Sequence, residues 1–453
     1  MTKLSGLDAV QFALERAKAA GAHSCDAVLA DSDALEVRVR GKEVDTVQQS
    51  RERTLGIRVF ADGAGGLRSA VTSSSDLARD AIARLAEDTV ALARATAPDH
   101  TAGLPSDGFA SALPDLELFD PADRALTTAD WIARAQRAED AARGFDARIT
   151  NSEGSSANAA RTSICYGSSA GFAGGYETAS HSMFSQPVAA ENGEMQTSWW
   201  MTASRHASKL DAPEEVGRIA AQRTLARLGA RRVPTCEVPV IFDAPSARDL
   251  LGNLVGCLSG YGVYRGSSFL REKMRARVAS ERVTIVDDGR VRAGLGSKPF
   301  DGEGQPTRRN VLVENGVLRS WLLDSYSARK LGLTTTGNAA RSAASAPTAA
   351  PTNLWLEPGA GDLDTLIRGM ERGLLVTGMF GHGFNAVTGD FSRGAHGFWI
   401  ERGERAFPVQ EITIAGNLGT MFEQIEAIAA DTRFLGSLGA PSLRIARMTI
   451  AGE

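Results

Sequence analysis

The sequence lacks the features that mark membrane-spanning, disulfide-rich and nucleic-acid-binding proteins. No stretch approaches the ~20 apolar residues of a membrane-spanning helix. Residues 1–21 have the apolar spacing of an amphipathic helix rather than the pattern of a signal peptide. The four cysteines form no CxxC pair, which favours reduced thiols in a cytoplasmic protein. A net charge of −4 argues against a basic face that binds nucleic acid.

Several catalytic motifs are also missing. There is no HExxH sequence and no phosphate-binding loop, and the serines of GSSAG at 167–171 are interpreted as turn residues rather than as a nucleophile. Among the six histidines, only His382 and His396 lie near each other, with Asp390 between them. These three residues could hold a metal ion. Histidines in a glycine-rich loop more often bond to backbone or water, which is the interpretation we favour.

Glycine is abundant, with 47 residues, and this density indicates tight turns and close backbone contacts. Apolar residues spaced as one face of a helix run from Leu7 to Ala17. Segments of strand character then continue to about residue 73 and predict a β-meander. Breaks between its strands are predicted at three polar sites: 31–33, 40–42 and 53. A long helix is expected next, capped by 74–76 and ending near Ala97.

Two domains of an α+β protein are predicted. The first, at 1–230, contains the helix–β-meander–helix unit, and the second, at 231–453, is β-rich with flanking helices. The proline-containing segment 98–118 is the best candidate for a linker. The helices expected after this linker are at 128–143, 213–229, 245–258, 324–331, 363–372 and 418–429. The Ala/Ser/Pro-rich segment 341–353 is expected to be a mobile surface loop, either functional or a plain connector.

The loop at 299–310 places Asp301 and Glu303 between glycines, with two arginines close behind. Two carboxylates in a tight loop could hold a cation. We favour a turn whose acidic side chains accept from backbone N–H groups or pair with arginines.

Residues 387–418, VTGDFSRGAHGFWIERGERAFPVQEITIAGNL, are the most distinctive part of the sequence. They predict a glycine-punctuated loop, three short strands and the start of a helix with Asn417 as its N-cap. Together with GSKPFDGEGQPTRRNVLVENGVL, LLDSYSARKLGLTTTGNAAR and PSLRIARMTIAG, they resemble the TldD/PmbA family, formerly described as modulators of DNA gyrase. The stretch GLLVTGMFGHGFNAVTGDFSRGAHGFWIERGE resembles the PmbA/TldE branch of that family.

The resemblance implies metal-dependent proteolysis of small or unfolded peptides by a TldD–TldE heterodimer. In the TldD branch, a helix carries HExxxH and a later cysteine supplies a further zinc ligand. The corresponding helix here, 245–258, has Gly252, Asn253 and Cys257 at the three motif positions, and no cysteine follows. The resemblance therefore implies that this chain holds no zinc cofactor, that a TldD-like partner bears the zinc, and that this chain helps to enclose the chamber.

The same helix region has a glycine at every fourth position, namely Gly252, Gly256 and Gly260. Residues at this spacing lie on one helix face, and a glycine face permits close approach of another backbone, within the chain or across a subunit interface. A loosely packed surface helix is the alternative.

The favoured function is the non-catalytic TldE/PmbA-like subunit of a TldD–TldE-type metalloprotease, which holds an extended peptide beside its partner's zinc. The residues expected to contact the peptide are His382, Asn385, Asp390, Ser392, His396 and Asn417. One alternative is a self-sufficient metal-dependent hydrolase that uses His382, Asp390 and His396. Another is a homo-oligomeric module that binds peptides without a hydrolytic partner.

Overall fold

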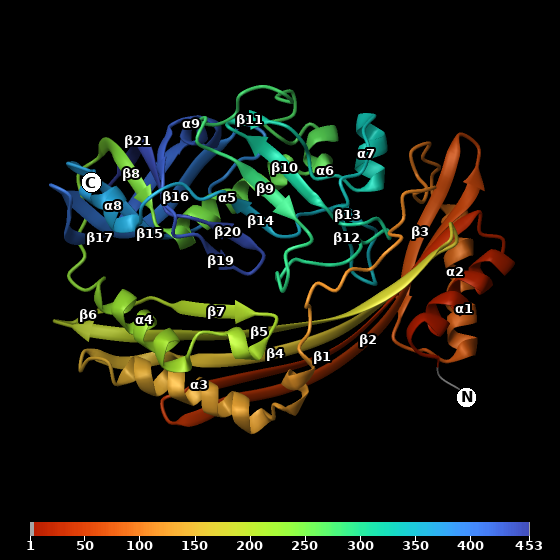
Figure 1. The fold of residues 1–453 in the computed structure, drawn as a ribbon, viewed down its shortest axis with the longest axis horizontal. Helices are drawn as coiled ribbons and strands as arrows, with labels where there is room; N and C mark the ends of the chain where they lie inside the picture. Colours follow the sequence, from red (N-terminus) through yellow and green to blue (C-terminus); the bar gives the residue numbers. More distant parts are fainter. Residues whose placement is uncertain (1–3, 453) are drawn as a thin grey trace.

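The computed structural model describes residues 4–452, and its first half is built on one large antiparallel sheet. The strand order is β3-β2-β1-β4-β5-β6, and β7 pairs with β5. The strands are β1 (Ser24–Arg40), β2 (Glu43–Gly63), β3 (Gly66–Ser74), β4 (Ile149–Ser168), β5 (Phe172–Glu191), β6 (Glu194–Thr197) and β7 (Trp200–Ser204). Figure 1 shows this sheet curving along one side of the C-terminal half.

Strands β1 and β2 are each continuous, so the predicted breaks at 31–33 and 53 are wrong. Asp31 and Arg53 are direct partners in the register, and Arg53 Nε donates to Asp31 Oδ2 at 2.9 Å. Such pairing of opposite charges lets polar residues continue a ladder instead of ending it. The turn predicted at 40–42 is confirmed, because β1 ends at Arg40 and β2 begins at Glu43.

The helices predicted in the first half are present. They are α1 (Gly6–Ala19), α2 (Arg79–Ala95), α3 (Thr128–Arg143) and α4 (Pro213–Leu225), with two 3-10 turns, η1 (Pro121–Ala125) and η2 (Ala207–Lys209). The cap predicted for α2 at 74–76 is wrong, because the N-cap is Ala78, which has extended backbone and no side-chain cap. Asp76 instead accepts from the N–H of Ala78 at 2.9 Å.

Both helix pairs cover the same face of the large sheet. Helices α1 and α2 pack on residues such as Leu29, and α3 and α4 pack on residues such as Val37. Because side chains alternate between the two faces of a strand, the even-numbered residues of β1 lie on the opposite face. That face is turned toward the C-terminal half (Figure 1).

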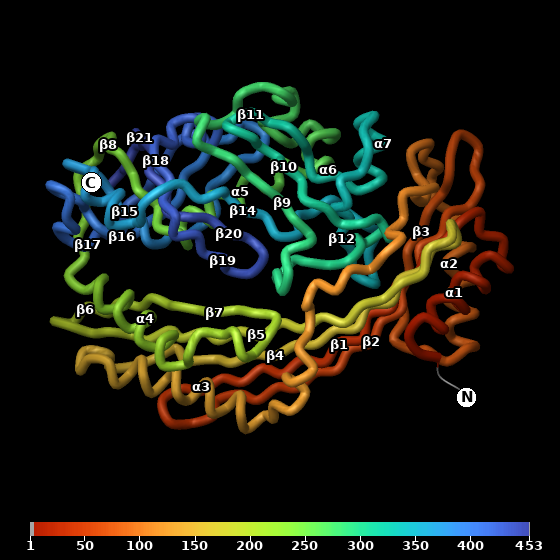
Figure 2. The backbone as a smooth tube through the Cα atoms, in the orientation of Figure 1, coloured from red at the N-terminus to blue at the C-terminus, as the bar shows by residue number. Residues whose placement is uncertain are grey.

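The segment at 98–118 is packed between the two halves. Asp99 accepts from the hydroxyl of Tyr326 at 2.6 Å, the N–H of Ala110 donates to the carbonyl of Gly304 at 2.9 Å, and the N–H of Ala293 donates to Leu116 O at 2.7 Å. Figure 2 shows the tube of this segment passing from α2 along the C-terminal half to α3. The connection therefore joins the halves by hydrogen bonds along its length.

The second half contains two six-stranded sheets and a two-stranded one. The first has the order β17-β16-β15-β8-β21-β18, and β17 also pairs with β21, so five strands form a closed ring. The second has the order β11-β10-β9-β14-β20-β19, and β12 pairs with β13. The strands are β8 (Cys236–Phe242), β9 (Ile285–Asp288), β10 (Arg309–Glu314), β11 (Val317–Leu318), β12 (Ala339–Ala340), β13 (Thr348–Ala349), β14 (Leu354–Leu356), β15 (Arg372–Phe380), β16 (Asp390–Glu401), β17 (Glu404–Asn417), β18 (Ile425–Ile428), β19 (Arg433–Leu435), β20 (Leu438–Ala440) and β21 (Leu443–Ala451).

Within the described residues, four short helices and one of 15 residues, α5, accompany these sheets. They are α5 (Ala244–Leu258), α6 (Gly260–Tyr264), α7 (Ser325–Leu331), α8 (Leu363–Arg368) and α9 (Leu418–Glu423). No helix among residues 4–452 has the length and apolar content needed to cross a membrane. With helices packed on mostly antiparallel sheets, the predicted α+β class is confirmed.

Two predictions for the distinctive stretch are wrong. Residues 390–417 form a hairpin of two long strands rather than three short ones, and its turn residues Arg402 and Gly403 both have positive φ, at 52° and 79°. The helix predicted at 418–429 ends at Glu423, because the residues from Ile425 onward pair with β21. Asn417 is confirmed as the N-cap, since its Oδ1 accepts from the N–H of Gly419 at 3.1 Å.

The segment at 341–353 is not simply a mobile surface loop. Thr352 and Asn353 are buried, and the Arg341 side chain is only 2% exposed. Between β12 and β13, Ser342 and residues 344–346 are exposed. The segment therefore contributes side chains to the interior as well as to the surface.

Candidate functional site

The face of the large sheet that looks toward the C-terminal half is lined by small and polar side chains. Glu36 lies beside Gln48 of β2 and Asn158 of β4, and Asn158 lies opposite Ser182 of β5. The neighbouring row, two residues along each strand, consists of Ser50, Ala34, Ala160 and Ser180. We call the even-numbered residues 28–38 of β1, with their partners on β2, β4 and β5, the chamber face.

Cavities follow the chamber face along its strands. The central one has a volume of about 480 Å³, and its opposite wall is formed by Leu295, Gly436 and Ser437 of the C-terminal half. A second, of about 430 Å³, continues from Glu36 to Arg38. A third, of about 300 Å³, lies toward the other end and carries aromatic and charged side chains of both halves. The chamber face thus has the form of a wall along which an extended ligand could lie.

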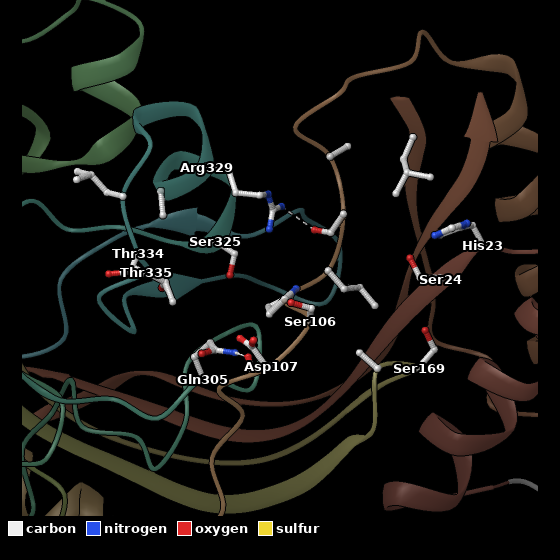
Figure 3. Close-up of a pocket in the computed structure, with 18 of the residues that line it drawn as sticks. His23, Ser24, Ser106, Asp107, Ser169, Gln305, Ser325, Arg329, Thr334 and Thr335 are labelled. Carbon is white, nitrogen blue, oxygen red and sulfur yellow. Dashed lines mark hydrogen bonds between the residues drawn. The ribbon is translucent and has the colours of Figure 1, made fainter. Parts of the chain in front are cut away.

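A further cavity of about 630 Å³ lies where the segment at 98–118 crosses to α7 (Figure 3). Arg329 of α7 donates to the carbonyls of Thr101 and Gly103 at 2.9 and 2.8 Å, and Gln305 donates to the carbonyl of Asp107 at 2.8 Å. These side chains are therefore used to hold the connecting segment. The arrangement indicates a junction between the halves more than a site of chemistry.

Helix α5 holds the three positions at which the zinc branch has its motif. Cys257 is fully buried, its Sγ lies 3.8 Å from the carbonyl oxygen of Ala386, and burial raises its pKa to about 11. Asn253 donates from Nδ2 to the carbonyl of Asp249 at 3.1 Å, and Gly252 has no side chain. A zinc site requires about three nitrogen, thiolate or carboxylate ligands, so these residues do not fit a zinc ion.

The predicted glycine face is only partly a packing surface. Helix α5 ends at Leu258, and Gly260 belongs to α6. A Cβ on Gly260 would lie 2.6 Å from side-chain atoms of α7, whereas a Cβ on Gly256 would meet nothing within 4 Å. Close packing within the chain is therefore observed at Gly260 and not at Gly256, where contact with another subunit stays a prediction.

Three of the six residues expected to contact peptide lie together. Asn417 donates from Nδ2 to Asp390 Oδ1 at 3.3 Å, and the N–H of Asn385 donates to the carbonyl of Asp390 at 2.9 Å. Asn385 directly precedes Ala386, whose carbonyl lies beside Cys257, so this cluster adjoins the end of α5. His382 and Ser392 are exposed nearby on the same loop and strand.

His396 lies apart from this cluster. Burial, with the positive charges of Arg227 and Arg223, lowers its pKa to about 3, so the ring is neutral at physiological pH. Across residues 4–452, no group of three histidine, cysteine, aspartate or glutamate side chains is placed to hold a metal ion. The structure therefore does not bring His382, Asp390 and His396 together as a metal site.

The interpretation of the loop at 299–310 is confirmed. Asp301 Oδ1 accepts from the N–H groups of Glu303 and Gln305 at 2.8 and 3.0 Å. Glu303 accepts from Arg58 Nη2 at 3.3 Å. Burial raises the pKa of Asp301 to about 7, with the nearby charge of Glu303 as a further cause. The two carboxylates are thus committed to backbone and arginine partners.

Sequence reasoning missed the chamber face. A signal was present, because charged residues alternate with apolar ones in part of β1, where Glu36 and Arg38 stand between Leu35, Val37 and Val39. Such alternation predicts a strand with one face outside the hydrophobic core. It does not predict that the C-terminal half of the chain lies opposite that face, with cavities between the two.

The fold defines the class of the protein: an α+β protein in two halves, with cavities between the chamber face of the large sheet and the C-terminal half. Three sequence profiles identify the family: PmbA/TldA metallopeptidase domain 1 matches residues 25–93, the central domain matches 121–228, and the C-terminal domain matches 235–452. The chain belongs to the PmbA/TldD family.

Relatives of known sequence and structure agree with this assignment. The metalloprotease PmbA of Escherichia coli O157:H7 is 39% identical over 450 residues, which are 98% of this chain and 96% of that protein. A proposed modulator of DNA gyrase from Bacteroides thetaiotaomicron has a TM-score of 0.90 at 29% identity over 99% of both chains. TldE from Thermococcus kodakarensis shares the fold, with a TM-score of 0.87 at 22% identity over 98% of this chain and 99% of that chain.

Proposed function

We propose that this chain is the TldE/PmbA-like subunit of a cytoplasmic TldD–TldE-type peptidase and that it supplies walls of the chamber in which small or unfolded peptides are held. The observation that carries the proposal is helix α5. At its motif positions it presents Gly252, an amide already bonded to Asp249, and a buried thiol whose pKa is raised to about 11. Cleavage is therefore assigned to a zinc-bearing TldD-type partner.

The chamber face supports the role of a peptide-holding wall. In the central cavity its side chains are mostly short and uncharged, so they leave room for an extended chain that runs along the strands. Asn158 has a buried Oδ1 without a hydrogen-bond partner among residues 4–452, and an unpartnered buried acceptor favours a ligand that brings an N–H group. A peptide backbone offers such donors at regular spacing.

Strand β19 offers a second mode of peptide contact. It is an edge strand of its sheet, and the turn that follows it, Gly436–Ser437, lines the central cavity. An extended peptide can add to a free strand edge by main-chain hydrogen bonds. The chamber would then fix a peptide between this edge and the chamber face.

The test is reconstitution with a purified TldD-type partner. The expected result is that an unstructured peptide is cleaved only in the mixture, while elemental analysis finds zinc in the partner and background zinc in this chain. Full activity of this chain alone would contradict the proposal. Peptide binding by this chain without cleavage in any mixture would favour the homo-oligomeric peptide-binding module instead.

A further inference from the structure

The third cavity on the chamber face, of about 300 Å³, contains an arginine that is only partly used. The Arg341 side chain is 2% exposed, lines the cavity and donates from Nη1 to Asp26 Oδ1 at 2.8 Å. Its Nε and Nη2 have no hydrogen-bond partner within residues 4–452. Buried donors on a charged group are rarely left without acceptors, so this pair of atoms calls for a partner.

The two unused nitrogens are on the side of the guanidinium that binds both oxygens of a carboxylate. Elsewhere in the chain, Arg137 uses the same pair, with Nε and Nη2 donating to the two carboxylate oxygens of Glu214 at 2.6 and 2.9 Å. Such two-point pairing is the strongest and most directional contact that arginine makes with a carboxylate. Arg341 carries this unused pair of donors and is one of the residues that line the cavity.

The rest of the cavity suits an apolar or aromatic group attached to that carboxylate. Tyr176 and Phe300 meet edge to face with centroids 5.3 Å apart, and the other apolar lining residues include Val28, Ala30, Ile164 and Tyr166. Lys298, whose Nζ donates to the carbonyl of Ala339 at 3.0 Å, lines the same space together with Asp301 and Glu52. These acidic groups disfavour a doubly charged phosphate more than a carboxylate with one charge.

We propose that this cavity binds the C-terminal residue of a peptide, with its carboxylate on Nε and Nη2 of Arg341 and its side chain against Tyr176 and Phe300. Ser342 and Ala344, which line the same cavity, are exposed, so a ligand can enter there. That the carboxylate belongs to a peptide terminus rests on the proposed function. The cavity and the unused donors of Arg341 are observed independently of that function. A free terminus held here would set one end of the peptide along the chamber face.

The experiment is calorimetric titration of the full chain, without a partner, with N-acetyl-L-phenylalanine and with its amide. The acid is expected to bind saturably and the amide at least about tenfold more weakly, because the amide carries no charge for the arginine. Arg341→Lys keeps a positive charge beside Asp26 but loses the two-point contact, and is expected to weaken acid binding by about tenfold or more.

A second variant keeps the test independent of the arginine network. Ala30→Leu fills the cavity and should abolish acid binding without altering any ion pair, whereas Ala91→Leu, at an exposed position of α2, should leave it unchanged. Equal binding of acid and amide, no binding by folded wild-type protein, or binding that survives Ala30→Leu would each overturn the proposal. Because no cleavage is measured, these results are separate from success or failure of the reconstitution with a TldD-type partner.

Discussion

The side chain of Leu438 lies over Gly252. If Gly252 carried a Cβ atom, that atom would be 3.9 Å from Cδ1 of Leu438. Leu438 begins β20, and the turn before it lines the central cavity of the chamber face. On the same side of the helix, Arg248 donates to the carbonyl of Leu435 at 3.2 Å. The β19–β20 hairpin therefore covers Gly252, the position that the resemblance to the TldD branch aligns with the first histidine of its motif.

This geometry predicts that Gly252→Ala and Gly256→Ala each stabilise the isolated chain. A contact at 3.9 Å is ordinary van der Waals packing, and Gly256 has open space, so the gain in helix propensity should dominate. The expected increase in the free energy of unfolding is about 0.5–1 kcal/mol for each, measured by urea denaturation. Gly397→Ala is the contrasting control, since its Cβ would lie 1.8 Å from the carbonyl oxygen of Leu375, and it should destabilise strongly.

A second prediction concerns Asp26, which joins the two halves at the base of the third cavity. Its carboxylate is fully buried and binds Arg58, Arg341 and the hydroxyl of Tyr166. Asp26→Asn removes the negative charge and leaves buried guanidinium groups without their counter-ion. We expect a loss of about 3–5 kcal/mol in the free energy of unfolding.

The control for Asp26 is Asp31→Asn, five residues along the same strand. Asp31 also pairs with arginine, through Arg53, but its side chain is 26% exposed, so water can replace the lost partner. The expected cost is below about 1 kcal/mol. Equal losses in the free energy of unfolding for the two variants would show that burial does not make the Asp26 network more important for stability than the partly exposed Asp31 pair.

A third prediction tests the chamber face in the reconstituted peptidase. Ala160→Phe places a ring in the central cavity and should reduce peptide cleavage by about tenfold or more, because the ring occupies the path of the substrate. Val47→Phe adds the same ring to the opposite face of the sheet at a residue that is 47% exposed. It should leave cleavage unchanged, and equal inhibition by both variants would argue against the chamber face as a substrate wall.

The sequence permits prediction of those features that depend on neighbours along the chain. The helix predicted at 245–258 could be recognised because its apolar spacing is local, and a helix is found at Ala244–Leu258. The same holds for the acidic turn around Asp301 and for the N-cap at Asn417, since each is completed within a few residues.

Other features depend on contacts that no local pattern records. Asp26 and Arg341 are separated by 315 positions, and the cavity that they border exists only because the C-terminal half covers the sheet. The spacing of Ile425 and Ile428 fits one face of a helix, but these residues pair with β21 as a strand, and a register shift between Ile425 and Ala427 interrupts the regular alternation. Tertiary pairing overrode the local preference in the same way for the continuous strands β1 and β2.

The last prediction concerns pH and His396. Burial and the nearby arginines hold its pKa at about 3 in the folded chain, against an ordinary value near 6.5 when unfolded. Between these values the unfolded chain binds the additional proton, so stability is full above about pH 6.5 and is lost as the pH falls. From pH 7 to pH 5, His396 should account for a loss of about 2 kcal/mol in the free energy of unfolding.

The variant His396→Gln should therefore lose less stability than wild type over that interval, as measured by urea denaturation. The control His382→Gln changes an exposed ring and should follow the wild-type curve. Parallel curves for wild type and His396→Gln would show that the half-buried imidazole of His396 does not set the acid sensitivity of the fold.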